Sequence, residues 1–265
     1  MDEPTTPAVR VERPAAGVVR LTLDRPQQRN ALTESMGAAL RAAVADVRAD
    51  QQARCLVITG AGSAFCSGAD LGVLGAAGDS WAERRQALSD YYRAFLDIRT
   101  LPIPSLAAVN GPAVGAGLNL ALACDLRLAA RGARLAASFV RVGIHPGGGC
   151  TWFLTRLVGP ARARELLLHG DAIDATRAEA LGLVNRVVEA EELAAAALEW
   201  AVRLAEGPGP VLRDIRQAVE LATDQSLEAV MAFETAAQAA SLMTEDAREG
   251  WQAFREKRPP RFTGR

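Results

Sequence analysis

Apolar runs alternate with polar loops along the first two thirds of the chain, and their spacing changes between strand-like and helix-like. Apolar and β-branched residues at 18–23 and 54–60 predict short buried strands, each followed by a loop of polar or small residues. Apolar side chains at helical spacing predict helices over 33–48, with Thr33 as the N-cap, and over 79–100. This order of elements predicts a mixed α/β core.

The stretch from Ala107 to Ala130 predicts a buried strand, a glycine-rich turn, a short apolar helix and a second strand that opens at Asp125. Only small residues stand between Pro112 and Gly117, so a ligand can approach the backbone closely. The first amides of a helix have no partner within the helix, and they lie at the positive end of its dipole. The turn is therefore a candidate site for an anion, or for an oxygen that becomes one during a reaction.

After residue 195 the pattern is helical almost to the end of the chain. A break at 207–210 separates helices that begin roughly at Val211, Ser226 and Glu245. We therefore predict two domains, a mixed β/α core over 1–195 and an all-helical domain over 196–265.

Composition narrows the classes of function. Hydrophobic residues make up 49% of the 265 residues, charged residues 23%, and the net charge is -1, so no basic field favours nucleic acid or an anionic membrane. Four widely spaced cysteines and two histidines form no metal-binding pattern, and we expect no metal and four free thiols in a reducing cytoplasm. The N-terminus lacks the apolar core of a secretory signal, and the apolar run over 113–124 is too short to span a membrane.

Two loops are candidates for carbonyl chemistry, AFCSGADL at 64–71 and NGPAVGAGLNL at 110–120. An amide from each loop can point at one oxygen and polarise a carbonyl, and each such donor is worth about 10²–10³ in rate. Neither loop is a Walker motif or a dinucleotide fingerprint. The alternative interpretation is that both are tight turns between packed elements.

Further segments match a known family in the same order. They are DRPQQRNAL at 24–32, AFCSGADL at 64–71, AVNGPAVGAGLNLALACDLRLAA at 108–130, GIHPGGG at 143–149, RAEALGLVNRVV at 177–188 and EGWQAFREKRPPRF at 249–262. Together they span nearly the whole chain, which resembles the crotonase superfamily, the enoyl-CoA hydratase/isomerase family.

The resemblance implies a crotonase-like spiral of ββα units, followed by a C-terminal helical domain that forms homotrimers, which often pair into hexamers. It implies an acyl-CoA ligand, with coenzyme A as part of that ligand and no prosthetic group. The backbone amides that match the family's oxyanion hole are those of Ala69 and Ala116. In the family this hole holds the thioester oxygen and stabilises an enolate-like intermediate.

The resemblance also implies contacts with coenzyme A from the first loop, the ADL segment and a neighbour's C-terminal tail. The matching residues are Arg25, Arg29, Cys66, Ser67, Gly68, Phe254 and Lys257. For the three charged residues, a solvated surface position is an equal alternative. The basic tail REKRPPRF is either a phosphate-facing clamp or a solvated tail.

The chain departs from the family at the residues that handle water and protons. The two glutamates of hydratases fall on Asn119 and Phe139, and a further acidic position falls on Gly147. An amide can hold a water molecule but cannot accept its proton near neutral pH, and a phenyl ring can do neither. The sequence therefore predicts that ordinary hydration is weak.

His145 is the one histidine of the third loop, a residue type suited to proton transfer near neutral pH, and it is either a replacement acid/base or a loop histidine bonded to backbone. Cys66 and Ser67 are possible nucleophiles, but no base is evident beside them in the sequence. Asp70 and Asp125 follow the two candidate loops, and we interpret both as structural.

The sequence favours a cytoplasmic acyl-CoA-handling enzyme of this family that works through a thioester enolate. Two alternatives remain open. One is a non-catalytic protein that binds and carries acyl-CoA, which the loss of both glutamates supports. The other is a decarboxylase or thioester hydrolase on the same scaffold, because decarboxylation generates an enolate without removing a proton.

Overall fold

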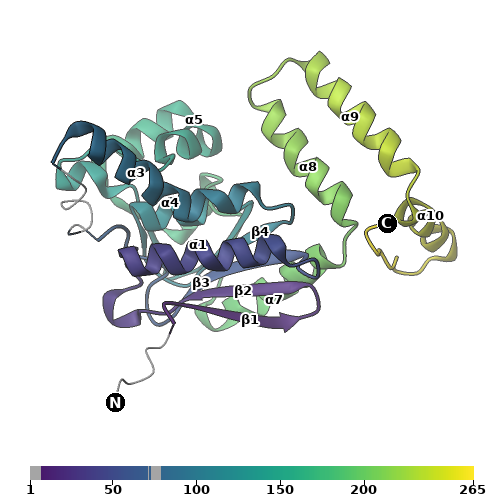
Figure 1. Ribbon diagram of the computed structural model, residues 1–265, viewed down its shortest axis with the longest axis horizontal. Coiled ribbons are helices and arrows are strands. Elements are labelled where there is room, and N and C mark those ends of the chain that lie inside the picture. The colour runs from purple at the N-terminus through teal and green to yellow at the C-terminus, as the bar shows by residue number, and fades with distance from the viewer. Residues whose placement is uncertain (1–6, 71, 73–78) are drawn as a thin grey trace.

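The computed structural model describes residues 7–70, 72 and 79–265. A six-stranded sheet runs through the core in the order β1-β2-β3-β4-β6-β9, with β1 antiparallel to β2 and the other pairs parallel (Figure 1). The strands are β1 Val9–Ala15, β2 Val18–Leu23, β3 Cys55–Gly60, β4 Ser105–Val109, β6 Leu126–Ala130 and β9 Arg186–Val188.

A second, smaller sheet has the order β5-β7-β8, with β5 Ala113–Val114, β7 Arg134–Ala136 and β8 Ala172–Asp174. Cys66 extends this sheet through a parallel bridge to Ala113. After β3, β4 and β6 alike, the chain therefore adds one strand or bridge to the second sheet before the next helix. This repeated connection is the spiral of ββα units that the sequence predicts.

Helices α1 (Glu34–Ala49) and α3 (Trp81–Leu96) pack over one face of the large sheet (Figure 1). Thr33 caps α1 as predicted, because its side chain accepts a hydrogen bond from the Met36 amide. In α1, the side chains that meet the core are Met36, Leu40, Ala43, Val44 and Val47. Their spacing of three or four residues explains why the sequence pattern located this helix.

Helix α7 (Leu193–Ala205) covers the opposite face of the large sheet. Its alanines at 197, 201 and 205 recur every four residues and let the helix lie close to the strand residues Val57 and Ala108. The predicted domain boundary at residue 195 falls inside this helix, two residues after its first residue. Packing against the sheet therefore continues to Ala205.

The remaining helices follow the order of the chain. Helix α4 (Ala116–Leu122) follows β5, and α5 (Cys150–His169) is interrupted at Gly159, where φ is 74°, so it consists of two shorter helical pieces. The other segments are α6 Ala175–Ala180 and the 3₁₀ turns Pro26–Gln28, Asp97–Thr100, Ser138–Val142 and Ala190–Glu192. In the described part of the chain, none of the helices has the length and apolar character needed to cross a membrane.

Helices α8 (Gly209–Ala222), α9 (Leu227–Leu242) and α10 (Glu245–Glu256) form an arm that extends away from the sheets (Figure 1). Arg216 anchors α8 to the core, since its Nε donates to Asp125 Oδ1 at 2.8 Å and its guanidinium also donates to the Leu101 carbonyl. The arm exposes large apolar side chains, among them Leu227, Met231, Leu242, Met243, Trp251 and Phe254. A role for this surface in trimers stays a prediction.

Candidate active site

The two candidate loops lie against each other. The Val114 amide donates to the Cys66 carbonyl at 3.0 Å, and the Cys66 amide donates to the Pro112 carbonyl at 3.1 Å. A Cβ atom at Gly117 would lie 2.2 Å from the Cys66 carbonyl oxygen, so the close approach of α4 to this loop requires glycine. The glycine-rich pattern of the second loop thus reflects direct contact with the first.

The amides of Ala69 and Ala116 lie at this junction. Gly68 has a φ of 99°, and a Cβ atom there would lie 2.5 Å from the Val114 carbonyl oxygen and 3.6 Å from the Ala116 nitrogen. Gly115, with a φ of 54°, turns the chain into α4. Within the described ranges, neither the Ala69 amide nor the Ala116 amide donates a hydrogen bond to another protein group. Both donors remain available to a ligand.

The loop after β2 joins this junction. The Ser67 amide donates to the Arg29 carbonyl at 3.0 Å, and the Leu32 amide donates to the Gly68 carbonyl at 2.8 Å. The Arg25 guanidinium donates to the carbonyls of Asp24 and Pro7. The structure therefore brings together the predicted positions in the first and second segments, although Leu71, the last residue of the second, lies outside the described residues.

Asn30 holds these segments together and escaped the sequence interpretation. It is fully buried, and its Nδ2 donates to the carbonyls of Ala61 and Ala64 at 2.9 and 2.8 Å. Its Oδ1 accepts from the Arg25 amide at 2.9 Å. A buried asparagine that makes three bonds to backbone fixes the loop in one conformation. Its φ of 55° lies in the left-handed region, which asparagine tolerates better than most residues. The residue type itself is therefore the one signal that the sequence offers.

Nucleophilic chemistry finds no support at Cys66 or Ser67. Cys66 is fully buried, and burial raises the pKa of its thiol to about 12, so the reactive thiolate is scarce. All four cysteines are free, as the sequence predicts. Asp70 accepts a hydrogen bond from the Gly72 amide at 2.7 Å, and Asp125 accepts from the Ser105 amide at 2.7 Å. Both carboxylates thus have the structural contacts expected of them.

Asn119 and Phe139 border the same junction. Asn119 lies on α4, one turn after Ala116, and is fully buried. Its Nδ2 donates to the Gly147 carbonyl at 2.7 Å, whereas its buried Oδ1 has no hydrogen-bond partner among the described residues. The ring of Phe139 ends 3.9 Å from where a Cβ atom of Gly115 would lie. Both residues are therefore next to the Ala116 turn.

Tyr92 is a second residue that sequence reasoning missed as part of the site. The apolar spacing over 79–100 predicts a helix there but does not indicate which loop this side chain contacts. In the structure a Cβ atom at Gly147 would lie 2.0 Å from Tyr92 Oη. The phenol therefore occupies the space where a side chain at position 147 would begin.

His145 is exposed on the third loop, and its Nδ1 lies 2.7 Å from the Pro146 carbonyl oxygen. Because a carbonyl only accepts, Nδ1 is the donor in this contact. The contact is the backbone bond expected of a structural loop histidine. Its role in catalysis stays a prediction.

Phe254 and Lys257 lie on the C-terminal arm, and a single chain does not bring them to the junction (Figure 1). Phe254 is 86% exposed, as expected for a residue that meets another subunit or solvent. In the basic tail, Arg258 donates to both carboxylate oxygens of Glu249, at 2.6 and 2.9 Å, which lowers the pKa of Glu249 to about 2. This guanidinium is therefore engaged within the chain.

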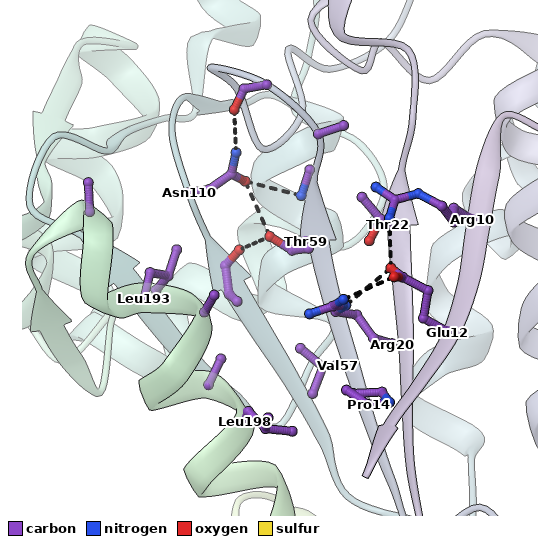
Figure 2. A pocket seen from close by; sticks show the side chains of 17 residues that line it. Arg10, Glu12, Pro14, Arg20, Thr22, Val57, Thr59, Asn110, Leu193 and Leu198 are labelled. Atoms are coloured by element: carbon purple, nitrogen blue, oxygen red, sulfur yellow. Dashed lines mark hydrogen bonds and ion pairs between the residues drawn. The ribbon is translucent and has the colours of Figure 1, made fainter. Parts of the chain in front are cut away.

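A cavity of about 330 Å³ lies elsewhere, between the large sheet and α7 (Figure 2). Figure 2 shows Arg10 and Arg20 directed at Glu12, and their bonds measure 2.9 and 3.1 Å. The cavity is lined by Val57 and Ala108, which alternate with the residues that face α1, so it opens on the opposite face of the sheet. Its charged groups pair with one another, and it is separate from the junction.

Metal chemistry has no support in the described ranges, which contain no group of three or more histidine, cysteine, aspartate or glutamate side chains able to hold an ion. The candidate site therefore consists of the backbone amides of Ala69 and Ala116. They are bordered by Asn119, Tyr92, Phe139 and Gly147.

Comparisons with known proteins identify the family. The family model described as Enoyl-CoA hydratase/isomerase matches residues 13–265. A "Probable enoyl-CoA hydratase" of Rhodobacter capsulatus is 42% identical over 94% of this chain and 95% of its own length. The 1,2-epoxyphenylacetyl-CoA isomerase of Escherichia coli is 38% identical over 94% and 96%. The crystal structure of an enoyl-CoA hydratase from Bacillus anthracis superposes with a TM-score of 0.91, at 35% identity, over 97% of this chain and all of that one.

Proposed function

Because the chain belongs to the enoyl-CoA hydratase/isomerase family of the crotonase superfamily, we propose that it binds acyl-CoA thioesters and acts on them through a thioester enolate. The observation that carries this proposal is the junction of the two loops. There the Ala69 and Ala116 amides have no acceptor among the described residues, and Gly68 and Gly117 are packed too closely for any larger residue.

In the proposed mechanism the two amides donate hydrogen bonds to the thioester oxygen. As the enolate forms, negative charge grows on that oxygen, so both hydrogen bonds strengthen toward the transition state. Backbone donors fixed by tight packing do not have to reorganise as the charge develops. Each is worth about 10²–10³ in rate, which makes this pair the main source of catalysis in the site.

Water and protons are handled weakly in this proposal. Asn119 holds the Gly147 carbonyl and cannot accept a proton, and Phe139 presents an apolar ring beside the turn. A positioned acid or base contributes about 10²–10⁴ in rate, so ordinary hydration should be slow by comparison with a relative that carries glutamates.

The same observation favours a second candidate, a protein that binds and carries acyl-CoA without turnover. The positions that carry acid/base residues in the family hold Asn119, Phe139 and Gly147, none of which titrates. A decarboxylation or thioester hydrolysis on this scaffold is the third candidate, since decarboxylation needs the oxyanion hole but no base. Activity on crotonyl-CoA separates the first candidate from the second.

Contacts with coenzyme A belong to the same proposal. Arg25, Arg29, Ser67 and Gly68 lie on two segments that bond to each other, so they can follow one extended ligand. Cys66, whose thiol is buried, would contribute only backbone. Phe254 and Lys257 would meet the ligand from a neighbouring subunit of a trimer or hexamer.

Two measurements test this function. The first mixes purified protein with crotonyl-CoA and follows the loss of the conjugated thioester absorbance, with a glutamate-bearing relative as the reference. We expect a rate lower by more than about 10², and a rate close to the reference contradicts the roles given to Asn119 and Phe139. The second is calorimetric titration with acyl-CoAs of several chain lengths, where absence of binding contradicts the whole proposal.

A further inference from the structure

The face of the large sheet that packs against α7 changes character along one row of neighbouring residues. Glu12 on β1 pairs with Arg20 on β2, and Arg20 pairs with Val57 on β3. Neighbours across a sheet point to the same face, and Val57 belongs to the apolar cluster that α7 covers. A charged half of this face therefore adjoins an apolar half, and the cavity in Figure 2 is lined by residues of both.

The apolar wall of the cavity comes mainly from α7. Its lining side chains there are Leu193, Ala194, Ala197 and Leu198. Leu193 and Ala197 are buried against the sheet, so packing fixes this wall in place. The cavity volume of about 330 Å³ is at the lower end of the range for small-molecule sites, roughly 300–1,000 Å³. A ligand here is therefore small and has an apolar part.

Two polar side chains of the cavity are engaged with backbone groups. The Thr59 hydroxyl donates to the Ala108 carbonyl at 2.8 Å. Asn110 accepts from the Gly60 amide at 3.1 Å and donates to the Gly62 carbonyl at 3.0 Å. These contacts hold the strand ends together, so neither side chain is the main anchor for a ligand.

Arg20 has donors to spare. Its Nε and Nη2 donate to the two carboxylate oxygens of Glu12, at 3.3 and 3.1 Å, and Arg10 donates to the same carboxylate at 2.9 Å. A guanidinium has five N–H donors, and Nη1 of Arg20 has no acceptor among the described residues. Figure 2 shows the guanidinium also extending away from Glu12. The outer edge formed by Nη1 and Nη2 is therefore open to a second carboxylate, which it can bind through two parallel hydrogen bonds.

We propose that this cavity binds a small carboxylate with an apolar body. The carboxylate accepts hydrogen bonds from the outer edge of Arg20, and the apolar body lies against Leu193 and Leu198. Glu12 beside the anchor repels further negative charge, so the site favours a monoanion over a dianion such as phosphate. The cavity is separate from the junction of the two loops, and this binding is independent of the proposed function.

Calorimetric titration with hexanoate, hexanol and hexylammonium tests the ligand chemistry, because the three share one apolar chain. Hexanoate should bind about tenfold more tightly than hexanol, since its hydrogen bonds to the guanidinium are charge-assisted. Hexylammonium should bind more weakly than hexanol, because Arg20 repels it. Equal affinities for hexanoate and hexanol, or no binding of hexanoate, overturn the inference.

Arg20→Gln tests the anchor. It removes the cation, so it should abolish the preference for hexanoate over hexanol. The matched control is Arg13→Gln on the same hairpin, since Arg13 pairs with Asp50 at 2.7 Å and is not among the lining residues. The control should keep the tenfold preference, and a preference that persists in Arg20→Gln contradicts the role of this residue.

Ala194→Phe tests the location without altering a charge. Ala194 is exposed and lines the cavity, so a phenyl ring there obstructs the cavity while the core stays as it is. Hexanoate binding should weaken about tenfold, whereas Ala195→Phe, at the next exposed position of α7 and outside the lining, should bind hexanoate like the wild type. Hexanoate binding that survives Ala194→Phe belongs to another site, the acyl-CoA site included, and overturns the inference.

Discussion

The two sides of the candidate site are built differently. One side, which we call the backbone wall, consists of residues 66–69 and 112–117, where peptide groups from two loops bond to each other and glycine allows the contact. The other, the side-chain wall, consists of Tyr92, Asn119, Phe139 and Gly147. Every residue except proline has a backbone N–H group, so the backbone wall only requires that no side chain intervenes. The chemistry of the side-chain wall changes with each substitution.

In the proposed function, this difference lets the chain bind acyl-CoA without the acid/base groups expected of the family. The Ala69 and Ala116 amides survive any substitution, other than by proline, that leaves the loop geometry intact. An acid or base is lost whenever the one residue that carries it is replaced. The comparison predicts that the backbone wall governs binding, and that the side-chain wall governs which reaction follows.

The largest expected effect comes from restoring acids to the side-chain wall. Asn119→Glu combined with Phe139→Glu should raise crotonyl-CoA hydration by about 10²–10⁴, because a carboxylate can accept the proton of a bound water. Each single substitution should give much less, since the two groups act as a unit. Continuous absorbance assays of the double and single variants measure this. If acyl-CoA still binds and no variant hydrates crotonyl-CoA faster, the roles assigned to the two walls are wrong.

Breaking the backbone wall should cost both stability and binding. Gly68→Ala places a side chain at a φ of 99° and within 2.5 Å of the Val114 carbonyl oxygen, so we expect a loss of about 2–4 kcal/mol in the free energy of unfolding. Acyl-CoA binding should fall as well, because the loop that carries the Ala69 amide must move.

The matched control for that substitution is Gly132→Ala. Gly132 does not have a left-handed φ, and a Cβ atom there meets nothing within 4 Å. Denaturant unfolding and calorimetric titration should find this variant within about 0.5 kcal/mol of the wild type, with its affinity unchanged. Equal losses in the two variants would show that Gly68 is no more constrained than an exposed glycine.

The sequence located the backbone wall because its signals are local. Thr33 and its helix, and the turn before Ala116, were predicted from neighbouring residues, and the structure confirms them. The side-chain wall depends on contacts between distant residues. Tyr92 meets Gly147 across 55 positions, and Asn30 holds Ala61 and Ala64 across 31 and 34. Helical spacing shows that a tyrosine faces inward, but not which loop it contacts.

The same limit applies to α7. Its alanines at every fourth position predict a helix with a narrow face, and the sequence assigned most of that helix to the C-terminal domain. The surface against which α7 packs is formed by strands 90 to 140 residues earlier in the chain, such as those that carry Val57 and Ala108. The local pattern therefore did not show that the helix across residue 195 packs against the large sheet.

A smaller effect tests whether Tyr92 alone excludes a side chain at position 147. Gly147→Ala in the wild type should cost about 1–3 kcal/mol, because its Cβ would overlap the phenol. In a Tyr92→Ala background the same substitution should cost less than about 0.5 kcal/mol, since the obstruction is gone. A double-mutant cycle by urea unfolding measures the coupling, and simple additivity of the two costs would refute the exclusion.

The smallest effect is expected at His145, the one histidine of the third loop. Its side chain is exposed and bonded to the adjacent Pro146 carbonyl, so His145→Ala should change stability by less than about 0.5 kcal/mol. If the side-chain wall consists of the four residues named above, the rate and its pH profile also stay unchanged between pH 5.5 and 8. A rate that falls tenfold in the variant, or the loss of an inflection near the usual histidine pKa of about 6.5, would add His145 to that wall as its acid/base.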